Sequence, residues 1–368
     1  MSFRAIEPAD FPWFDYQRYT FSLGLTDGAR AYLSGHSASE YDPDEGHIVV
    51  TGGMAEQTRT AYAKIERILD AAGTTFAQVP RVVEYVTARG IERYEEAAGV
   101  RRELFGDHEP AVCTVVVDRL LRAQALIEIE VTAGGSGDVV YLPSMTAPEA
   151  GDGLLAQTEA VFAKAARALE GAGLDMSNVV KTLDYTTPAT LSEYRRTGQV
   201  RKDHLGPVYP AAAGILLSRL QTPETLISLD IIACRGAVEA VNPGWQRYEK
   251  LTYSPAVRAG DLLFMSGQAA LDPATETAVH PGDVVAQAEY TYANIIEVLR
   301  AAGAGPEHLV KTIEYVTPDG LADYRGVAAV REAALRAPWP ASTGCVCRAL
   351  LRPEFLIEID PFAILTGA

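Results

Sequence analysis

Carboxylates stand inside three short apolar stretches of the sequence, where an acid could exchange protons with a bound molecule. They are Glu84, Asp184 and Glu314. Side chains of a strand alternate between its two faces, so Glu84 shares a face with the apolar Val82 and Val86. An ionised carboxylate on such a face is costly unless it is paired or its pKa rises, and groups with shifted pKa values cluster at functional sites. This pattern favours a general acid or base in each stretch.

An alternative explanation for the same acids is structural. A buried carboxylate is also stabilised by an ion pair, and arginines occur near the ends of later strands. The candidate partners are Arg119, Arg219 and Arg348. The sequence leaves both interpretations open, and Glu84 and Glu314 are therefore candidate catalytic residues.

One histidine could also take part in proton transfer. His36 lies in a turn directly after Ser34 and Gly35. An unperturbed imidazole has a pKa of about 6.5, so this side chain could exchange protons near neutral pH. We expect Ser34 and an acid such as Glu130 to be its partners. The alternative is a turn histidine with a structural hydrogen bond.

A threefold internal repeat explains why these residues recur. In each copy a Pro-Ala pair is followed, 16 residues after the proline, by a Leu-Ile pair. The prolines are Pro110, Pro210 and Pro340. Each copy also contains an amphipathic helix, a short strand, a second helix and two closing strands, and the last strand ends in an acid. These acids are Glu130, Asp230 and Asp360. Repetition of one such unit predicts an α+β fold in which helices cover one face of a sheet.

The repeat divides the chain into three tandem domains, which we place at residues 1–134, 135–236 and 237–368. The copies are unequal, because the second has too few residues before its opening strand to hold a first strand of its own. The segment 235–250 contains Asn242-Pro243-Gly244 and is typical of a linker.

Composition and charge exclude several classes of function. The 368 residues carry a formal net charge of −16, and no basic cluster opposes it, which argues against a nucleic-acid partner. No apolar run is long enough to span a membrane, and the N-terminus lacks the pattern of a signal peptide, so we expect a cytoplasmic protein with no membrane partner. The four cysteines lack metal-ligand spacing and the usual cofactor motifs are missing, so we expect neither a metal nor a cofactor.

Motifs in the third repeat resemble the reactive intermediate deaminase (RidA/YjgF) family. They are Ser266-Gly267-Gln268, the stretch 310–316, the pair Pro340-Ala341 and the stretch 352–360. The resemblance extends over the first repeat and is weaker in the second. Family members are homotrimers with a chorismate-mutase-like fold that hydrolyse enamines and imines in clefts between subunits. The resemblance therefore implies an intramolecular pseudo-trimer with three unequal clefts, and we expect a monomer in solution.

The resemblance is incomplete at the position that binds substrate. In active deaminases an arginine follows the Pro-Ala pair and binds the substrate carboxylate, whereas this sequence has Val112, Ala212 and Ser342. A methyl or hydroxyl group cannot replace a bidentate guanidinium. Efficient deamination of a substrate such as 2-aminoacrylate is therefore not expected. The acids that close the repeats persist, and the resemblance implies that they position the hydrolytic water.

We expect the working cleft to combine the first and third repeats, because the second has lost the Ser-Gly turn. Candidate catalytic residues are His36, Glu84, Glu130, Glu314 and Asp360. Candidate substrate-binding residues are Ser34, Gly35, Ser266, Gly267, Gln268, Arg119, Arg348 and Trp339. Either arginine could anchor a substrate carboxylate, and the tryptophan could form an aromatic wall.

These residues predict an enzyme that applies general acid and base catalysis to a small-molecule substrate. The expected reaction is water addition, elimination or tautomerisation at an enamine, imine or enol-ether carbon, and a role in specialised metabolism fits a fused and diverged scaffold. The alternative is a non-catalytic pseudo-trimer that binds a metabolite or a partner protein. The net charge and the lack of a metal or paired-histidine motif disfavour a nuclease.

Overall fold

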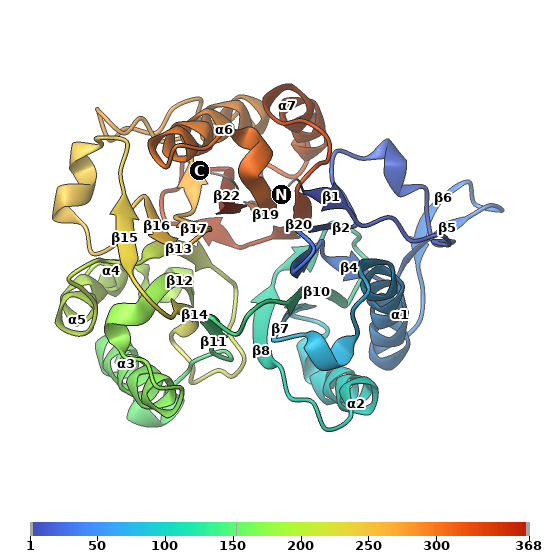
Figure 1. Ribbon diagram of the computed structural model, residues 1–368, viewed down its shortest axis with the longest axis horizontal. Helices are drawn as coiled ribbons and strands as arrows, with labels where there is room; N and C mark the ends of the chain where they lie inside the picture. Colours follow the sequence, from blue (N-terminus) through green and yellow to red (C-terminus); the bar gives the residue numbers. More distant parts are fainter. Residues whose placement is uncertain (1–2, 152, 366–368) are drawn as a thin grey trace.

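Three β-sheets lie around a common centre, and helices cover the outer face of each sheet (Figure 1). The computed structural model describes residues 3–151 and 153–365. Each sheet belongs mainly to one copy of the repeat, so the predicted α+β class and pseudo-trimeric arrangement are confirmed. The domain limits and the monomeric state stay predictions. Within the described ranges, no helix is long and apolar enough to cross a membrane.

The first unit has a sheet in the order β1-β2-β3-β10-β7-β8, with β4 paired to β10 and a separate β5-β6 hairpin. Its elements are β1 (Arg4–Ala5), β2 (Gly24–Thr26), β3 (Arg30–Leu33), β4 (His36–Ser37), β5 (Ser39–Asp42), β6 (His47–Val50), α1 (Met54–Ala72), β7 (Arg81–Thr87), α2 (Tyr94–Phe105), β8 (Ala111–Val117), β9 (Arg119–Leu120) and β10 (Ile127–Gly134). Helix α1 buries Tyr62 and Ile65 against the sheet. It ends at Gly73, whose φ of 75° suits the left-handed C-cap that the sequence predicts.

The second and third units repeat this plan with differences at their edges. The second unit contains β11 (Val139–Tyr141), α3 (Leu154–Gly171), β12 (Val179–Thr186), α4 (Leu191–Tyr194), α5 (Thr197–His204), β13 (Ala211–Leu216) and β14 (Ser228–Cys234). The third contains β15 (Val238–Val241), β16 (Ala256–Ala259), β17 (Leu262–Met265), β18 (Gln268–Ala269), α6 (Val284–Ala301), β19 (Leu309–Val316), α7 (Val327–Ala334), β20 (Ala341–Val346), β21 (Ala349–Leu350) and β22 (Ile357–Ile364). Among the described strands of the second unit, none takes the place of β2 or β16, as the sequence predicts.

The segment at residues 235–250 is more ordered than a linker. Residues 238–241 form β15, which pairs with β16 at the edge of the third sheet. The Asn242 side chain then accepts hydrogen bonds from the backbone N–H groups of Gly244 and Trp245. Trp245 packs into the core of the third unit. The linker prediction was wrong here because an edge strand needs a partner on one side only and tolerates polar side chains.

The three sheets are joined at their edges by contacts between units. Strand β9 of the first unit pairs with β20 of the third, and β21 of the third pairs with β13 of the second. At the remaining seam the Asp118 carboxylate accepts a hydrogen bond of 3.0 Å from the Ser218 backbone N–H. Hydrogen bonds therefore link all three units into a closed ring within one chain.

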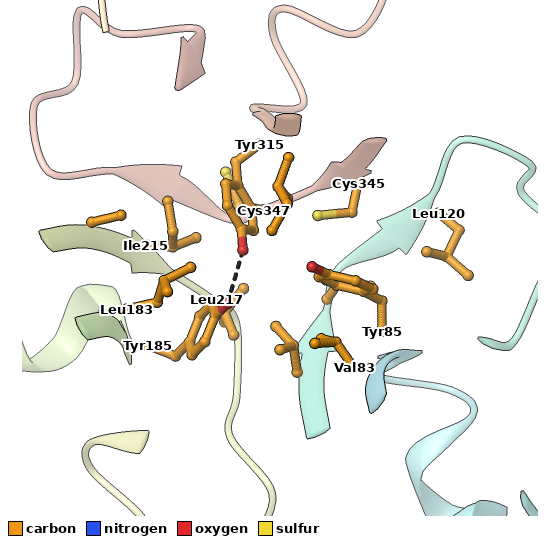
Figure 2. Packing of buried hydrophobic residues seen from close by; sticks show 14 of the residues in the cluster. Val83, Tyr85, Leu120, Leu183, Tyr185, Ile215, Leu217, Tyr315, Cys345 and Cys347 are labelled. Atoms are coloured by element: carbon orange, nitrogen blue, oxygen red, sulfur yellow. Dashed lines mark hydrogen bonds between the residues drawn. The ribbon is translucent and has the colours of Figure 1, made fainter. Parts of the chain in front are cut away.

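The inner faces of the sheets pack into one shared core (Figure 2). Tyr85, Tyr185 and Tyr315 hold equivalent positions in it and are fully buried or nearly so. The hydroxyls of Tyr185 and Tyr315 lie 2.8 Å apart and share a hydrogen bond. Within the described part of the chain, the Tyr85 hydroxyl has no hydrogen-bond partner.

This asymmetry predicts unequal effects of removing the hydroxyls. Tyr185→Phe leaves the Tyr315 hydroxyl unpaired in the core, so we expect the free energy of unfolding to fall by about 1–3 kcal/mol. Tyr85→Phe removes a hydroxyl without a protein partner, so the free energy of unfolding should stay nearly unchanged or rise. Urea-induced unfolding of the two variants provides the comparison, and equal losses would contradict this account of the core.

Candidate functional site

The acids that close the three repeats lie between units, near the centre of the molecule. Lys311 Nζ lies 2.5 Å from Glu130 Oε1. The equivalent pairs are Asp230 with Arg81 and Asp360 with Lys181. In every pair the base comes from the central strand of a neighbouring unit. Because a buried charge is costly unless it is paired, these ion pairs tie the units together.

The in-strand acids face the helices of their own unit. The Glu84 carboxylate accepts hydrogen bonds from the hydroxyls of Tyr62 (3.0 Å) and Tyr94 (2.5 Å), and Arg101 Nη1 lies 2.5 Å from it. The equivalent groups are Glu314 with Tyr292, Tyr324 and Arg331, and Asp184 with Tyr194 and Arg201. This arrangement is the ion pair of the structural explanation, but the arginine comes from the second helix of the unit instead of a strand end.

A cleft of about 940 Å³ opens between the first and third units. Part of its lining comes from Phe14 and residues 18–21 of the segment 11–21 before β2, which we call the strap. The rest includes the turn between β3 and β4, the loop after β9, the start of α7 and residues of β10 and β20. The cavity therefore lies where the sequence predicts a cleft between the first and third repeats.

The Ser-Gly turn of the first unit forms the junction with the third. Gly35 donates its backbone N–H to the Ser342 carbonyl (3.3 Å), and the Ser342 N–H donates to Ser34 Oγ (2.8 Å). A Cβ added at Gly35 would lie 2.4 Å from Oε1 of Glu128 and 2.8 Å from Cγ2 of Thr343, so a larger residue there would have to displace these side chains. Ser342, which follows the pair Pro340-Ala341, lines the cleft.

The same junction recurs between the third and second units. Gly267 donates its N–H to the Ala212 carbonyl (3.1 Å), and Ser266 Oγ accepts from the Ala212 N–H (2.8 Å). A Cβ at Gly267 would lie 2.3 Å from an oxygen of Glu358. The Gln268 amide donates to the Ser266 carbonyl (3.2 Å). These candidate substrate-binding residues therefore make contacts within the protein.

Glu128 is the cleft carboxylate that the sequence analysis did not single out. It lies on β10 two residues before Glu130, lines the cleft and is 9% exposed. Burial, and then the charge of Glu130, raise its pKa to about 8, while Lys64 opposes this shift. Glu128 is thus mainly protonated at neutral pH. The available signal was the recurrence of an acid two residues before the closing acid in the first and third units, as Glu128 and Glu358, where the second unit has Ser228.

His36 also lines the cleft, but its imidazole is neutral at pH 7. Burial, and then the positive charge of Lys64, lower its pKa to about 3. Its Nε2 lies 3.4 Å from the Leu23 carbonyl oxygen. Ser34 donates to the Ser22 carbonyl (2.6 Å), and Glu130 pairs with Lys311, so the structure does not bring His36, Ser34 and Glu130 together as expected.

Arginines give the cleft a basic lining on a strongly acidic protein. The chain has a formal net charge of −16, yet the lining holds five arginines and two glutamates. The arginines are Arg18, Arg119, Arg122, Arg325 and Arg331. Arg331 is paired with Glu314, and Arg18 lies 3.6 Å from Asp15. Because Glu128 is mainly protonated at neutral pH, the cleft attracts anions.

Two of the candidate substrate-binding residues lie outside the large cleft. Arg348 is exposed at the seam between the third and second units, where its backbone N–H donates to the Leu216 carbonyl. Trp339 packs against the core of the third unit. Neither lines the large cleft, so of the proposed carboxylate anchors Arg119 is the one that the structure brings to it.

Comparison with known proteins identifies the family. A family model described as Endoribonuclease L-PSP matches residues 16–134 and 248–365, more than half of the chain. The chain therefore belongs to this family, and its resemblance to RidA/YjgF proteins is confirmed. The matched ranges lie in the first and third units, whose residues form the cleft.

Relatives and solved structures agree with this assignment. A RutC family protein of Synechocystis is 35% identical over 113 residues, 31% of this chain and 85% of that protein. The 2-iminobutanoate/2-iminopropanoate deaminase of Escherichia coli is 32% identical over 136 residues, 36% of this chain and 95% of that protein. A solved chorismatase structure has a TM-score of 0.54 and 18% identity, and the match covers 78% of this chain and 93% of that one. That likeness concerns the fold.

The raised pKa of Glu128 predicts a pH dependence of stability. Between the ordinary pKa of 4.5 and the folded value of about 8, folded Glu128 holds a proton that the unfolded chain has lost. Its contribution to the free energy of unfolding is therefore complete below pH 4.5 and falls as pH rises, by up to about 1.4 kcal/mol per pH unit.

Glu128→Gln removes this dependence. We expect the variant to gain stability relative to the native chain as pH rises between these values, measured by urea-induced unfolding across the range. Glu332→Gln, at an exposed glutamate of the same cleft, is the control and should run parallel to the native chain. A constant difference between Glu128→Gln and the native chain would contradict the assignment.

Proposed function

We propose that the protein is an enzyme that adds water to an enol-ether, enamine or imine carbon of an anionic metabolite in the cleft between its first and third units. The observation that carries this proposal is the presence, in one large cleft, of a carboxyl group that keeps its proton at neutral pH and of several arginines. A protonated carboxyl group is a general acid, and guanidinium groups bind carboxylates.

Glu128 is suited to the proton-transfer step. For an enol ether R–O–C(=CH2)–COO⁻, the Glu128 carboxyl donates its proton to the terminal carbon, and the electron pair of the C=C bond forms the new C–H bond. Water adds to the resulting oxocarbenium carbon and returns a proton to Glu128. The hemiketal then breaks its C–OR bond, its hydroxyl proton passes to the leaving oxygen, and ROH and pyruvate are released. One water is consumed, and Glu128 is restored.

The positions of the arginines favour a substrate larger than a three-carbon imino acid. Ser342 occupies the site of the deaminase arginine next to the turn, so a small carboxylate has no guanidinium there. Arg119, Arg122 and Arg325 belong to other elements of the same cleft. A cavity of about 940 Å³ also exceeds what a three-carbon substrate fills.

The names of similar proteins fit this class of substrate. The relative from Escherichia coli is named for the deamination of 2-imino acids, and the structural neighbour is a chorismatase. Chorismate carries an enol ether, and imino acids are the tautomers of enamines. We therefore propose an unsaturated or imino carboxylate as the substrate of this chain, with a role in specialised metabolism.

A second candidate function is binding without catalysis. The basic cleft would retain an anionic metabolite even if Glu128 transferred no proton, and the lack of the deaminase arginine in all three units favours this alternative. The two functions differ in their dependence on Glu128: a binder keeps its affinity in Glu128→Gln and releases no product in either form.

The catalytic proposal predicts unequal effects of two equivalent glutamates. Glu358 lies beside Gly267 as Glu128 lies beside Gly35, and its pKa is also raised to about 8 by burial, but it does not line the large cleft. With chorismate as the first substrate tested, pyruvate release should fall at least about 100-fold in kcat for Glu128→Gln. Glu358→Gln should change it less than about twofold.

Two outcomes would argue against this assignment of the acid. Equal losses of kcat in both variants would show that Glu128 affects the reaction only by supporting the fold. If neither chorismate nor 2-iminopropanoate generated in situ is turned over, while calorimetry detects anion binding, the non-catalytic function is favoured.

The arginines that line the cleft predict a separate effect on affinity. Arg119→Gln removes a charge from the cleft, so we expect KM, or Kd for a bound anion, to rise by about 10- to 100-fold with a smaller change in kcat. Arg348→Gln is the control, because this arginine of the third unit, one residue earlier in the repeat than Arg119, lies outside the cleft lining. The same change in both variants would mean that only the net charge of the protein matters.

A further inference from the structure

We propose that Lys64 is a positioning residue of the candidate cleft: its buried ammonium fixes the strap and the segment after β4 against α1, next to Glu128, whose register partner on β4 is Ser37. This inference deepens the proposed function and rests on it, because Glu128 matters to the reaction only if this cleft is the active site.

Hydrogen bonds from Lys64 hold the main chain of the cleft lining. Lys64 lies in the middle of α1, and it is 0% exposed. Its Nζ donates to the carbonyl oxygens of Ser37 (2.7 Å) and Ser39 (2.5 Å). Both serines line the cleft. An ammonium has three donors, so two of them fix this segment and one is left for another partner.

Aromatic rings of the strap lie close to the same ammonium. Lys64 Nζ is 5.4 Å from the centroid of the Phe14 ring and 5.8 Å from that of Trp13. A desolvated cation near an aromatic face is attracted by the quadrupole of the ring. The Trp13 carbonyl also accepts a hydrogen bond of 2.6 Å from the Tyr41 N–H of β5. Lys64 therefore connects α1 to two segments that line the cleft.

The equivalent residues of the other units make simpler contacts. Lys164 is partly exposed, donates to the Thr146 carbonyl (2.7 Å) and pairs with Glu149. Asn294 donates to the Leu271 carbonyl (3.0 Å). A neutral amide is thus sufficient for the fold at this position, so the buried charge of the first unit has a different role.

Three titratable groups face Lys64 from the strands packed near α1. They are His36 on β4, Glu40 on β5 and Glu128 on β10. Burial lowers the pKa of Lys64 to about 7, although Glu40 and Glu128 oppose this effect. The ammonium in turn lowers the pKa of Glu128 against the larger effects of burial and of Glu130. Lys64 and Glu128 therefore titrate in the same pH range and influence each other.

Two substitutions separate the charge of Lys64 from its hydrogen bonds. Lys64→Gln removes the charge and keeps a donor, whereas Lys64→Met removes both and keeps the length of the side chain. Asn294→Ala is the matched control, because it deletes the equivalent contact in the third unit.

The first measurement is the titration of Glu128 by NMR of protein labelled with ¹³C at the glutamate carboxyl, with the signal assigned by its loss in Glu128→Gln. In Lys64→Gln we expect the apparent pKa of Glu128 to rise by about half to one unit. Asn294→Ala should leave it unchanged. An unchanged titration in Lys64→Gln would overturn the proposal, and so would an equal shift in the control.

The second measurement is amide hydrogen exchange of residues 11–21 and 36–42. Lys64→Met should exchange at least about tenfold faster in both segments, because the contacts that close them are lost. The proposal is refuted if exchange there is unchanged or quickens equally in Asn294→Ala. If Lys64→Met does not fold, the same exchange measurement on Lys64→Gln decides between the two outcomes. This variant lacks the attraction between the Lys64 ammonium and the aromatic rings of the strap. Neither measurement requires turnover, so failure of the proposed function and failure of this inference are distinguishable.

Discussion

Three buried ion pairs at the centre of the molecule are the interaction on which the rest of the structure depends. Each joins the closing acid of one unit to a base on the central strand of a neighbour, as Glu130 joins Lys311. Removal of one partner from such a pair typically costs about 3–5 kcal/mol, because it leaves an uncompensated buried charge, so each closing acid needs the neighbouring unit that supplies its base. The paired edge strands β9 and β21 then extend the sheets across two seams. The clefts between units follow from this ring.

Strand β10 connects the central ion pairs to the candidate cleft. β10 carries Glu130 at the centre and, two residues earlier on the same face, Glu128 at the cleft. Burial contributes most to the raised pKa of Glu128, and the charge of Glu130 adds to it. The acidity of the cleft carboxyl therefore depends on the same packing that holds the units together. A change that loosens the ring is expected to alter both stability and the protonation of Glu128.

Fusion of the three units allows each cleft to differ. The position of Glu128 is Ser228 in the second unit and Glu358 in the third, and the large arginine-lined cleft contains only the first of these. The buried ammonium of Lys64 is replaced by the amide of Asn294 in the third unit. In a homotrimer all three clefts would carry the same residues. One chain can instead give each junction its own residues, such as the arginines of the cleft between the first and third units.

The sequence by itself determined the threefold repeat and the α+β units, because periodicity, turn glycines and equal spacing are local properties of the chain. It also indicated that Glu84 needs a partner, but helix α2 and its Arg101 meet that strand only after folding. The tertiary structure alone decided that Glu130 faces a lysine of another unit while Glu128 faces the cleft. The two acids lie two residues apart on one strand, so the alternation of side chains places both on the same face. Their pKa values and roles depend on burial and on charges from distant segments, which no local pattern specifies.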